Sequence, residues 1–204
     1  PFDDFIAEQL AGDLINPDDP EKIIATGFLA IGTKGLNEQN ARQFRFDLVD
    51  EQIDTTTQAF LGTTAACARC HDHKFDPIPM SDYYSLAGIF LSSDTLFGTT
   101  RSTQNRRSTE LLSLPSGFET GGEDQSLASM IDLEFRAEVA REALREAQSN
   151  ITEARRSGDN ETANRLRLQL VGLNNRLGEI EGQLAAYSDS GKKLALAMGM
   201  KDRE

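Results

Sequence analysis

All the cysteine and histidine side chains of this sequence lie in one short stretch, residues 67–73, which reads Cys-Ala-Arg-Cys-His-Asp-His. Any chemistry that needs a thiol or an imidazole must take place there. A Cys-x-x-Cys-His pattern is typical of covalent haem c attachment. Each thiol adds across one haem vinyl group, the two intervening residues set the sulfur spacing, and the adjacent histidine binds the iron. The pattern therefore predicts Cys67 and Cys70 as attachment thiols and His71 as the proximal iron ligand.

Three other sites could use the same side chains. A non-haem zinc or iron site, and with it an enzyme, would take four ligands: Cys67, Cys70, His71 and His73. Asp72 or Asp76 would assist there, although adjacent Cys70 and His71 are hard to aim at one ion. A thioredoxin-like redox pair needs a βαβ frame, which the sequence does not show. A plain Cys67–Cys70 disulfide in a structural module is the third alternative.

The sixth iron ligand is a separate question. His73 lies only two residues from His71, so one short segment cannot easily bracket the macrocycle, and we expect a supporting role or a contact with a nearby aspartate. Met80 follows a rigid Pro77-Ile78-Pro79 segment that could return a thioether to the iron and raise the reduction potential. Met80 could equally be a hydrophobic contact before a helix, and an open sixth position also remains.

Composition narrows the class of protein. The chain has 204 residues, with 33 acidic and 21 basic side chains and a formal net charge of −12. A nucleic-acid-binding protein would show a basic patch, and docking on an anionic membrane needs clusters of Lys and Arg. No apolar run approaches the ~18 residues that span a bilayer. The acidic balance suits a redox partner protein with a basic surface.

Helical patterns dominate the sequence before residue 98. Apolar residues recur at three- and four-residue spacing from Phe2 to Leu14, which predicts an amphipathic helix. Asp19-Pro20 predicts the start of a second helix, and residues 38–61 predict a third. Ser81 is expected to cap a fourth helix. We therefore predict a mainly α, cytochrome-c-like domain at residues 1–98, followed by a Ser/Thr/Gly-rich loop at 99–125 with one short strand.

The remaining sequence predicts a long antiparallel helical hairpin, a coiled coil, at residues 126–187. Its turn is the segment 157–160, which reads Ser-Gly-Asp-Asn. The first helix carries apolar residues in steps of four: Leu127, Ile131, Phe135, Val139, Ala143, Ala147 and Ile151. The second carries them in alternating steps of four and three, the pattern of a heptad seam: Leu166, Leu170, Leu173, Leu177, Ile180, Leu184 and Tyr187. Residues 188–204 are expected to lead into a following domain.

Several longer strings resemble one family, the second cytochrome-like domain of the large planctomycete cytochrome-c-type envelope proteins. The strings are residues 1–14, 25–28, 67–79, 82–84 and 197–200. The resemblance implies covalent haem c, electron transfer, and a place beside other domains of the same chain in an exported protein; an oxidoreductase activity stays open. Haem c attachment itself suits an oxidising compartment such as the periplasm. We accordingly expect the sequence to be a piece of a longer protein.

Overall fold

The computed structural model describes residues 1–102, 104–115, 126–188 and 191–202, and helices account for most of them. The predicted mainly α fold is confirmed. The chain divides into two compact units. One contains the helices before residue 98 and the short strands, and the other contains two long helices.

The first unit contains six helical segments and four short strands among the described residues. The helical segments are α1 (Phe2–Ile15), α2 (Pro20–Ala25), the 3-10 helix η1 (Thr26–Ala30), α3 (Ala41–Leu61), the 3-10 helix η2 (Ala65–Arg69) and α4 (Met80–Leu91). The strands are β1 (Ser93–Leu96), β2 (Leu112–Ser113), β3 (Leu196–Ala197) and β4 (Gly199–Asp202).

Local sequence explains where several of these helices begin and end. The Asp19 side chain accepts a hydrogen bond from the Glu21 amide ahead of α2, and Pro20 occupies the first helical position, as predicted. Asn40 caps α3 in the same way, so this helix starts three residues later than the predicted run. Gly62 ends α3 with φ of 67°, a conformation that glycine adopts without strain.

The core of the first unit forms where α3, η2 and α4 meet. Its fully buried members come from all three segments: Val49, Ile53, Ala65, Ala68, Tyr83 and Ala87. Two alanines on η2 let the backbone of this turn approach α3 and α4 closely. The segment that carries the cysteines is therefore fixed on the core of the unit.

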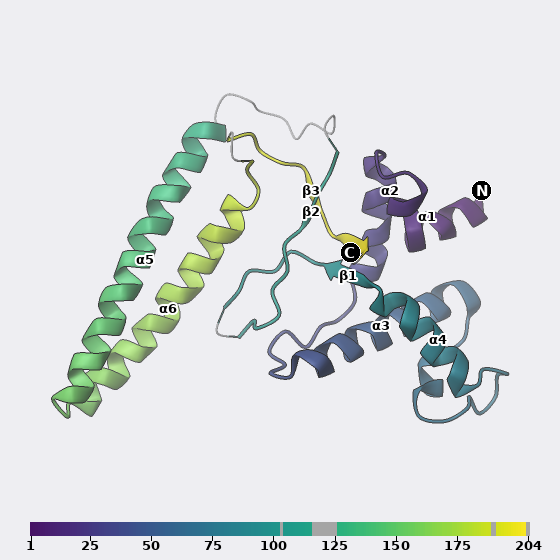
Figure 1. Ribbon diagram of the computed structural model, residues 1–204, viewed down its shortest axis with the longest axis horizontal. Helices are drawn as coiled ribbons and strands as arrows, with labels where there is room; N and C mark the ends of the chain where they lie inside the picture. Colours follow the sequence, from purple (N-terminus) through teal and green to yellow (C-terminus); the bar gives the residue numbers. More distant parts are fainter. Residues whose placement is uncertain (103, 116–125, 189–190, 203–204) are drawn as a thin grey trace. The chain divides into compact units, whose positions relative to one another are not determined.

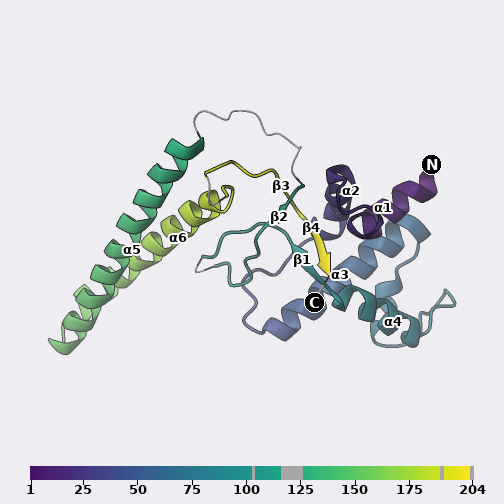
Figure 2. The same cartoon turned by 45° about the horizontal axis from the view of Figure 1, so that its top comes forward.

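Strands from distant parts of the sequence complete the unit. β1 pairs antiparallel with β4, with Ser93 opposite Asp202, and β2 pairs antiparallel with β3. Figure 2 shows β4 running beside β1. The buried Gln52 side chain on α3 donates to Thr95 Oγ1 at 2.9 Å. The segment predicted to lead into a following domain thus carries two strands that pair within this unit, while the predicted domain boundaries stay a prediction.

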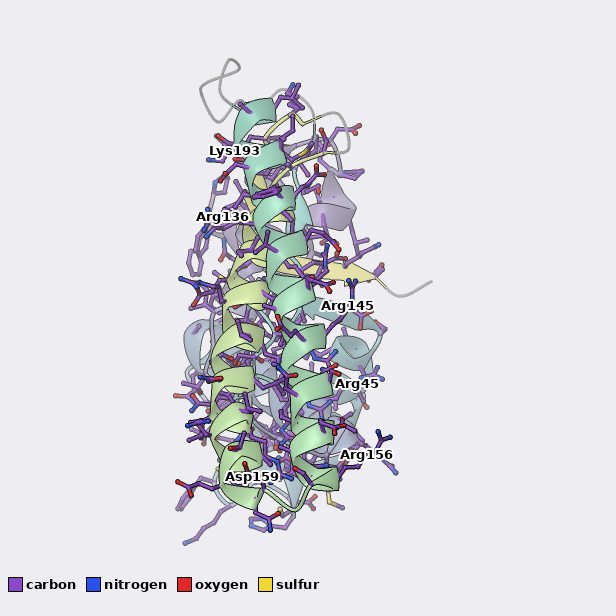
Figure 3. All side chains as sticks on the ribbon, turned by 90° about the vertical axis from the view of Figure 1, so that its left-hand side faces the viewer. Arg45, Arg136, Arg145, Arg156, Asp159 and Lys193 are labelled. Atoms are coloured by element: carbon purple, nitrogen blue, oxygen red, sulfur yellow. The ribbon has the colours of Figure 1, made fainter. Side chains whose placement is uncertain are left out.

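The second unit contains the predicted antiparallel hairpin, made of α5 (Ser126–Arg156) and α6 (Asn160–Leu184), which lie side by side. Gly158, with φ of 76°, makes the turn, and the Asp159 side chain caps α6 by accepting from the Thr162 amide. Arg156 and Asp159 mark the turn end in Figure 3. An ion pair of 2.9 Å between Arg141 and Glu181 joins the two helices on their exposed side.

The apolar seam of α5 differs from the predicted one. The buried residues follow alternating steps of four and three: Leu133, Ala137, Ala140, Leu144, Ala147, Ile151 and Ala154. The first four residues of the predicted stripe, Leu127, Ile131, Phe135 and Val139, are more than half exposed. Each step of four overshoots a full helical turn by about 40°, so that stripe drifts off the seam. On α6 the predicted seam is correct, since Leu177, Leu184 and Tyr187 pack around buried Ile180.

Among the described residues, no helix combines the length and the apolar character that crossing a membrane requires.

Candidate functional site

The Cys-x-x-Cys segment forms a turn with one buried face and one exposed face. η2 is a 3-10 helix, in which residues three apart share a face. Ala65 and Ala68 lie on the buried face and are 2% and 0% exposed. Cys67 and Cys70 have the same spacing, and both are exposed, free thiols. The two sulfurs are therefore presented to solvent from a turn whose back is fixed in the core.

Residue 69, between the two cysteines, is held through its side chain and its backbone. The Arg69 guanidinium lies 3.0 Å from Asp50 Oδ2 and 3.6 Å from Asp47 Oδ1, both on α3. The Tyr84 hydroxyl on α4 donates to the Arg69 carbonyl at 3.0 Å. The Tyr83 hydroxyl donates to the other oxygen of Asp50 at 2.6 Å. These contacts connect the motif to both neighbouring helices.

Electrostatics at this network follow from burial and charge. Burial raises the pKa of Tyr83 well above its ordinary value, and the hydrogen bond to Asp50 raises it further. Burial alone would lower the pKa of Arg69, but Asp50 and the other neighbours outweigh it and raise the pKa above its usual value. The guanidinium is therefore always charged, and a phenolate at Tyr83 is strongly disfavoured.

His71 is exposed, and its Nδ1 lies 2.8 Å from the Asp72 carbonyl oxygen. A carbonyl can only accept a hydrogen bond, so Nδ1 carries the ring proton. Nε2 is left with its lone pair, which is the form that a metal-binding imidazole takes. The residue predicted as the proximal ligand thus has its second nitrogen held in the way iron ligation requires.

His73 is held by hydrogen bonds at both ring nitrogens, and its side chain is only 6% exposed. Its Nδ1 accepts from the Asp76 amide at 2.8 Å and from the Phe75 amide at 3.3 Å. Nε2 is then the protonated nitrogen and donates to Thr64 Oγ1 at 3.3 Å. The predicted contact with a nearby aspartate is present. Binding iron through His73 would require these contacts to break.

Met80 is the first residue of α4, with Pro79 rather than Ser81 at the capping position, so the predicted cap was wrong. The helix starts one residue earlier because the Asp72 carboxylate accepts from the Met80 amide at 2.8 Å. This carboxylate takes the place of a local cap. The Met80 residue itself is 41% exposed.

The described residues contain no cluster of three or more His, Cys, Asp or Glu side chains arranged to hold a metal ion. The four ligands predicted for a non-haem site are therefore not assembled around a common point. The two thiols are also not joined in a disulfide.

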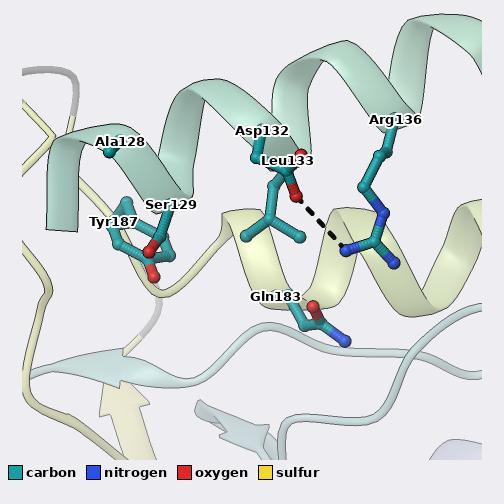
Figure 4. A pocket seen from close by; sticks show the side chains of 7 residues that line it. All are labelled: Ala128, Ser129, Asp132, Leu133, Arg136, Gln183 and Tyr187. Atoms are coloured by element: carbon teal, nitrogen blue, oxygen red, sulfur yellow. Dashed lines mark ion pairs between the residues drawn. The ribbon is translucent and has the colours of Figure 1, made fainter. Parts of the chain in front are cut away.

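An open hollow lies on the hairpin, away from the motif in sequence. Figure 4 shows its lining from α5 and from the end of α6: Ala128, Ser129, Asp132, Leu133, Arg136, Gln183 and Tyr187. Its charged pair, Asp132 and Arg136, is separated by 3.5 Å, and both side chains are more than half exposed. Such a pair is worth little to stability and directs no charge into a buried site.

Comparison with known proteins identifies the part of the chain that carries the motif. Residues 1–95 match the family PSCyt2, described as "Protein of unknown function (DUF1549)". This part of the chain belongs to the PSCyt2 family. The resemblance to the planctomycete cytochrome-like domain is thereby confirmed, and the PSCyt2 domain contains α1 to α4 with the Cys-x-x-Cys-His motif. No curated protein and no solved structure matches the chain.

The side chains of the PSCyt2 domain fit a covalently attached haem. Both thiols lie on the exposed face of the turn, and His71 keeps Nε2 available. The segments that flank the motif also carry exposed apolar side chains, as a flat apolar macrocycle requires on its surroundings: Leu61, Phe75, Met80 and Tyr84. Phe75 is 82% exposed and Leu61 is 73% exposed, which leaves apolar surface for a bound group to cover.

Asp50, Arg69 and the two tyrosines are the residues of this site that sequence reasoning missed. Arg69 stands inside the motif, which is a signal that an arginine at this position has a partner to find. No local pattern pairs it with Asp50, which lies 19 residues earlier. Tyr83 and Tyr84 were recognised only as members of a helix.

Proposed function

We propose that the PSCyt2 domain binds one haem c covalently and transfers electrons as a module of a larger exported protein. The observation that carries the proposal is the turn itself, with Cys67, Cys70 and His71 on the exposed side and Ala65 and Ala68 in the core. The bound haem would supply one-electron redox chemistry. Everything else is done by the chain, which supplies the thiols, the axial nitrogen and the charged surroundings.

Attachment uses only what the chain holds. Each thiol adds across a vinyl group, so that sulfur bonds to one vinyl carbon and the thiol hydrogen ends on the other. No oxidant is needed, but both thiols must be reduced, as they are here. Nε2 of His71 would bind the iron, while Nδ1–H stays on the Asp72 carbonyl and fixes the ring orientation.

Of the two predicted candidates for the sixth position, Met80 has the better support. The structure assigns no hydrogen bond to its thioether within the described residues, whereas both nitrogens of His73 are engaged. A thioether ligand would raise the reduction potential. The formal charge of −12 suits a redox partner with a basic surface, and haem c chemistry suits an oxidising, periplasmic compartment.

The test is expression of the 204-residue chain with the c-type maturation apparatus in a bacterial periplasm. A pyridine haemochrome spectrum and a haem-stained denaturing gel are then recorded. We expect one covalent haem per chain, retained by Met80→Ala and lost when Cys67 and Cys70 are both changed to Ala. Absence of covalent haem in the unaltered chain would overturn the proposal. Elemental analysis and a thiol count would then separate a zinc or iron site from a disulfide.

A further inference from the structure

Asp50 connects the three segments that surround the motif through a single carboxylate. Its Oδ2 accepts from Arg69 at 3.0 Å and its Oδ1 accepts from Tyr83 at 2.6 Å. Asp50 belongs to α3, Arg69 to η2 and Tyr83 to α4. Both carboxylate oxygens are thus used, one on a charged donor and one on a phenol.

The burial of these groups makes the contacts worth more than a surface pair. The Asp50 side chain is 28% exposed and that of Arg69 is 33% exposed. Charge-assisted hydrogen bonds in such surroundings are stronger than neutral ones and are screened less by salt. The more distant partner of Arg69 is Asp47, which is half exposed and 3.6 Å away, so Asp50 holds the guanidinium more firmly.

We infer that Asp50 is a positioning residue of the haem site: through Arg69 it fixes the turn that presents the two thiols, and it neutralises the charge that Arg69 places beside the haem. This inference rests on the proposed function. Residue 69 stands between the attachment cysteines, so its charge must lie close to a haem that they hold. Asp50 touches neither the thiols nor His71 and acts only through its neighbours.

Two opposite effects follow from the charges. Reduced haem carries one more electron than oxidised haem, so nearby positive charge favours reduction. Asp50→Asn leaves the guanidinium less compensated and raises the reduction potential. Arg69→Gln leaves the aspartates without their cation and lowers it. Loss of packing alone has no reason to move the potential in these two directions.

A second effect needs no haem. Without the Asp50 carboxylate, the turn loses its link to α3, and its backbone amides should open more often. We expect hydrogen exchange of residues 65–71 to accelerate by about fivefold in Asp50→Asn, the factor that corresponds to a loss of about 1 kcal/mol. Tyr83→Phe removes one donor only and should give a smaller acceleration in the same segment.

The experiment compares Asp50→Asn, Arg69→Gln and Tyr83→Phe with the unaltered 204-residue chain, using haem stoichiometry, electrode potential and hydrogen exchange. The matched control is Asp54→Asn, which removes the same charge one turn along α3, where the carboxylate accepts from Gln58. We expect haem loading in all four variants, potential shifts of opposite sign at positions 50 and 69, and small effects at position 54.

The outcomes separate the two proposals. If the unaltered chain carries haem but Asp50→Asn matches Asp54→Asn in potential and in exchange, the positioning role is wrong. Shifts of the same sign at positions 50 and 69 would also overturn it. If Asp50→Asn does not fold, Tyr83→Phe decides, and unchanged exchange there contradicts the inference. If the unaltered chain carries no haem, the proposed function itself fails.

Discussion

The Asp72 carboxylate accepts a hydrogen bond from the Met80 amide at 2.8 Å and so connects the residue after His71 to the first turn of α4. The first amides of a helix lack partners within the helix, and a side-chain oxygen that satisfies one stabilises it. Here that oxygen comes from eight residues earlier instead of from the capping position. The loop after the motif is thereby closed at both of its ends.

This contact predicts that Asp72→Ala lowers the free energy of unfolding by about 1 kcal/mol, the usual effect of losing a helix cap. Urea denaturation followed by circular dichroism would measure it. Asp72→Asn keeps an oxygen that can accept from Met80 and should lose much less. Equal losses in the two variants would mean that the negative charge, rather than the hydrogen bond, is what matters.

The two histidines should respond differently to substitution. His73→Leu removes the acceptor for the Asp76 and Phe75 amides and should lower the free energy of unfolding by about 1–3 kcal/mol. On the proposed function it should leave the axial-ligand spectrum of a haem-loaded chain unchanged. Met80→Ala should alter that spectrum instead. A changed ligand spectrum in His73→Leu, with Met80→Ala unaffected, would assign His73 to the iron.

The seam of the hairpin gives a prediction that compares two neighbouring residues of α5. Leu133 is 7% exposed against α6, whereas Ile131 is 54% exposed. Leu133→Ala should lower the free energy of unfolding by about 2–5 kcal/mol, because it leaves a cavity in the interface. Ile131→Ala should change it by about 0.5 kcal/mol or less. Thermal unfolding of both variants checks this, and the reverse order would restore the stripe of four-residue steps.

Sequence patterns identified the features that neighbouring residues determine. The Asp19-Pro20 start of α2 depends on two adjacent residues, and the seam of α6 depends on a regular repeat, so both could be read directly. The Cys-x-x-Cys-His motif was equally local. What escaped prediction joins distant segments: Asp50 with Arg69, and β1 with β4 across more than half the chain. Such pairs depend on how helices pack, and no spacing in the sequence encodes that.

The seam of α5 escaped for a different reason. Its first half carries two sets of apolar residues, one at steps of four and one that alternates steps of four and three. Small alanines such as Ala137 and Ala140 occupy the buried face, while the larger Phe135 is exposed. Hydrophobic size therefore pointed to the wrong face. The close approach of two helices selects small residues, and only the partner helix shows which face that is.

The pKa of Tyr83 predicts how stability changes at alkaline pH. Burial and the hydrogen bond to Asp50 raise this pKa in the folded chain above the ordinary value near 10. Above that pH the unfolded chain loses the phenol proton while the folded chain keeps it, so stability falls as pH rises. The contribution of Tyr83 is fully present below pH 10 and is lost as pH climbs through the folded pKa. Denaturation midpoints between pH 8 and pH 11 should fall less steeply in Tyr83→Phe than in the unaltered chain, and parallel curves would contradict the raised pKa.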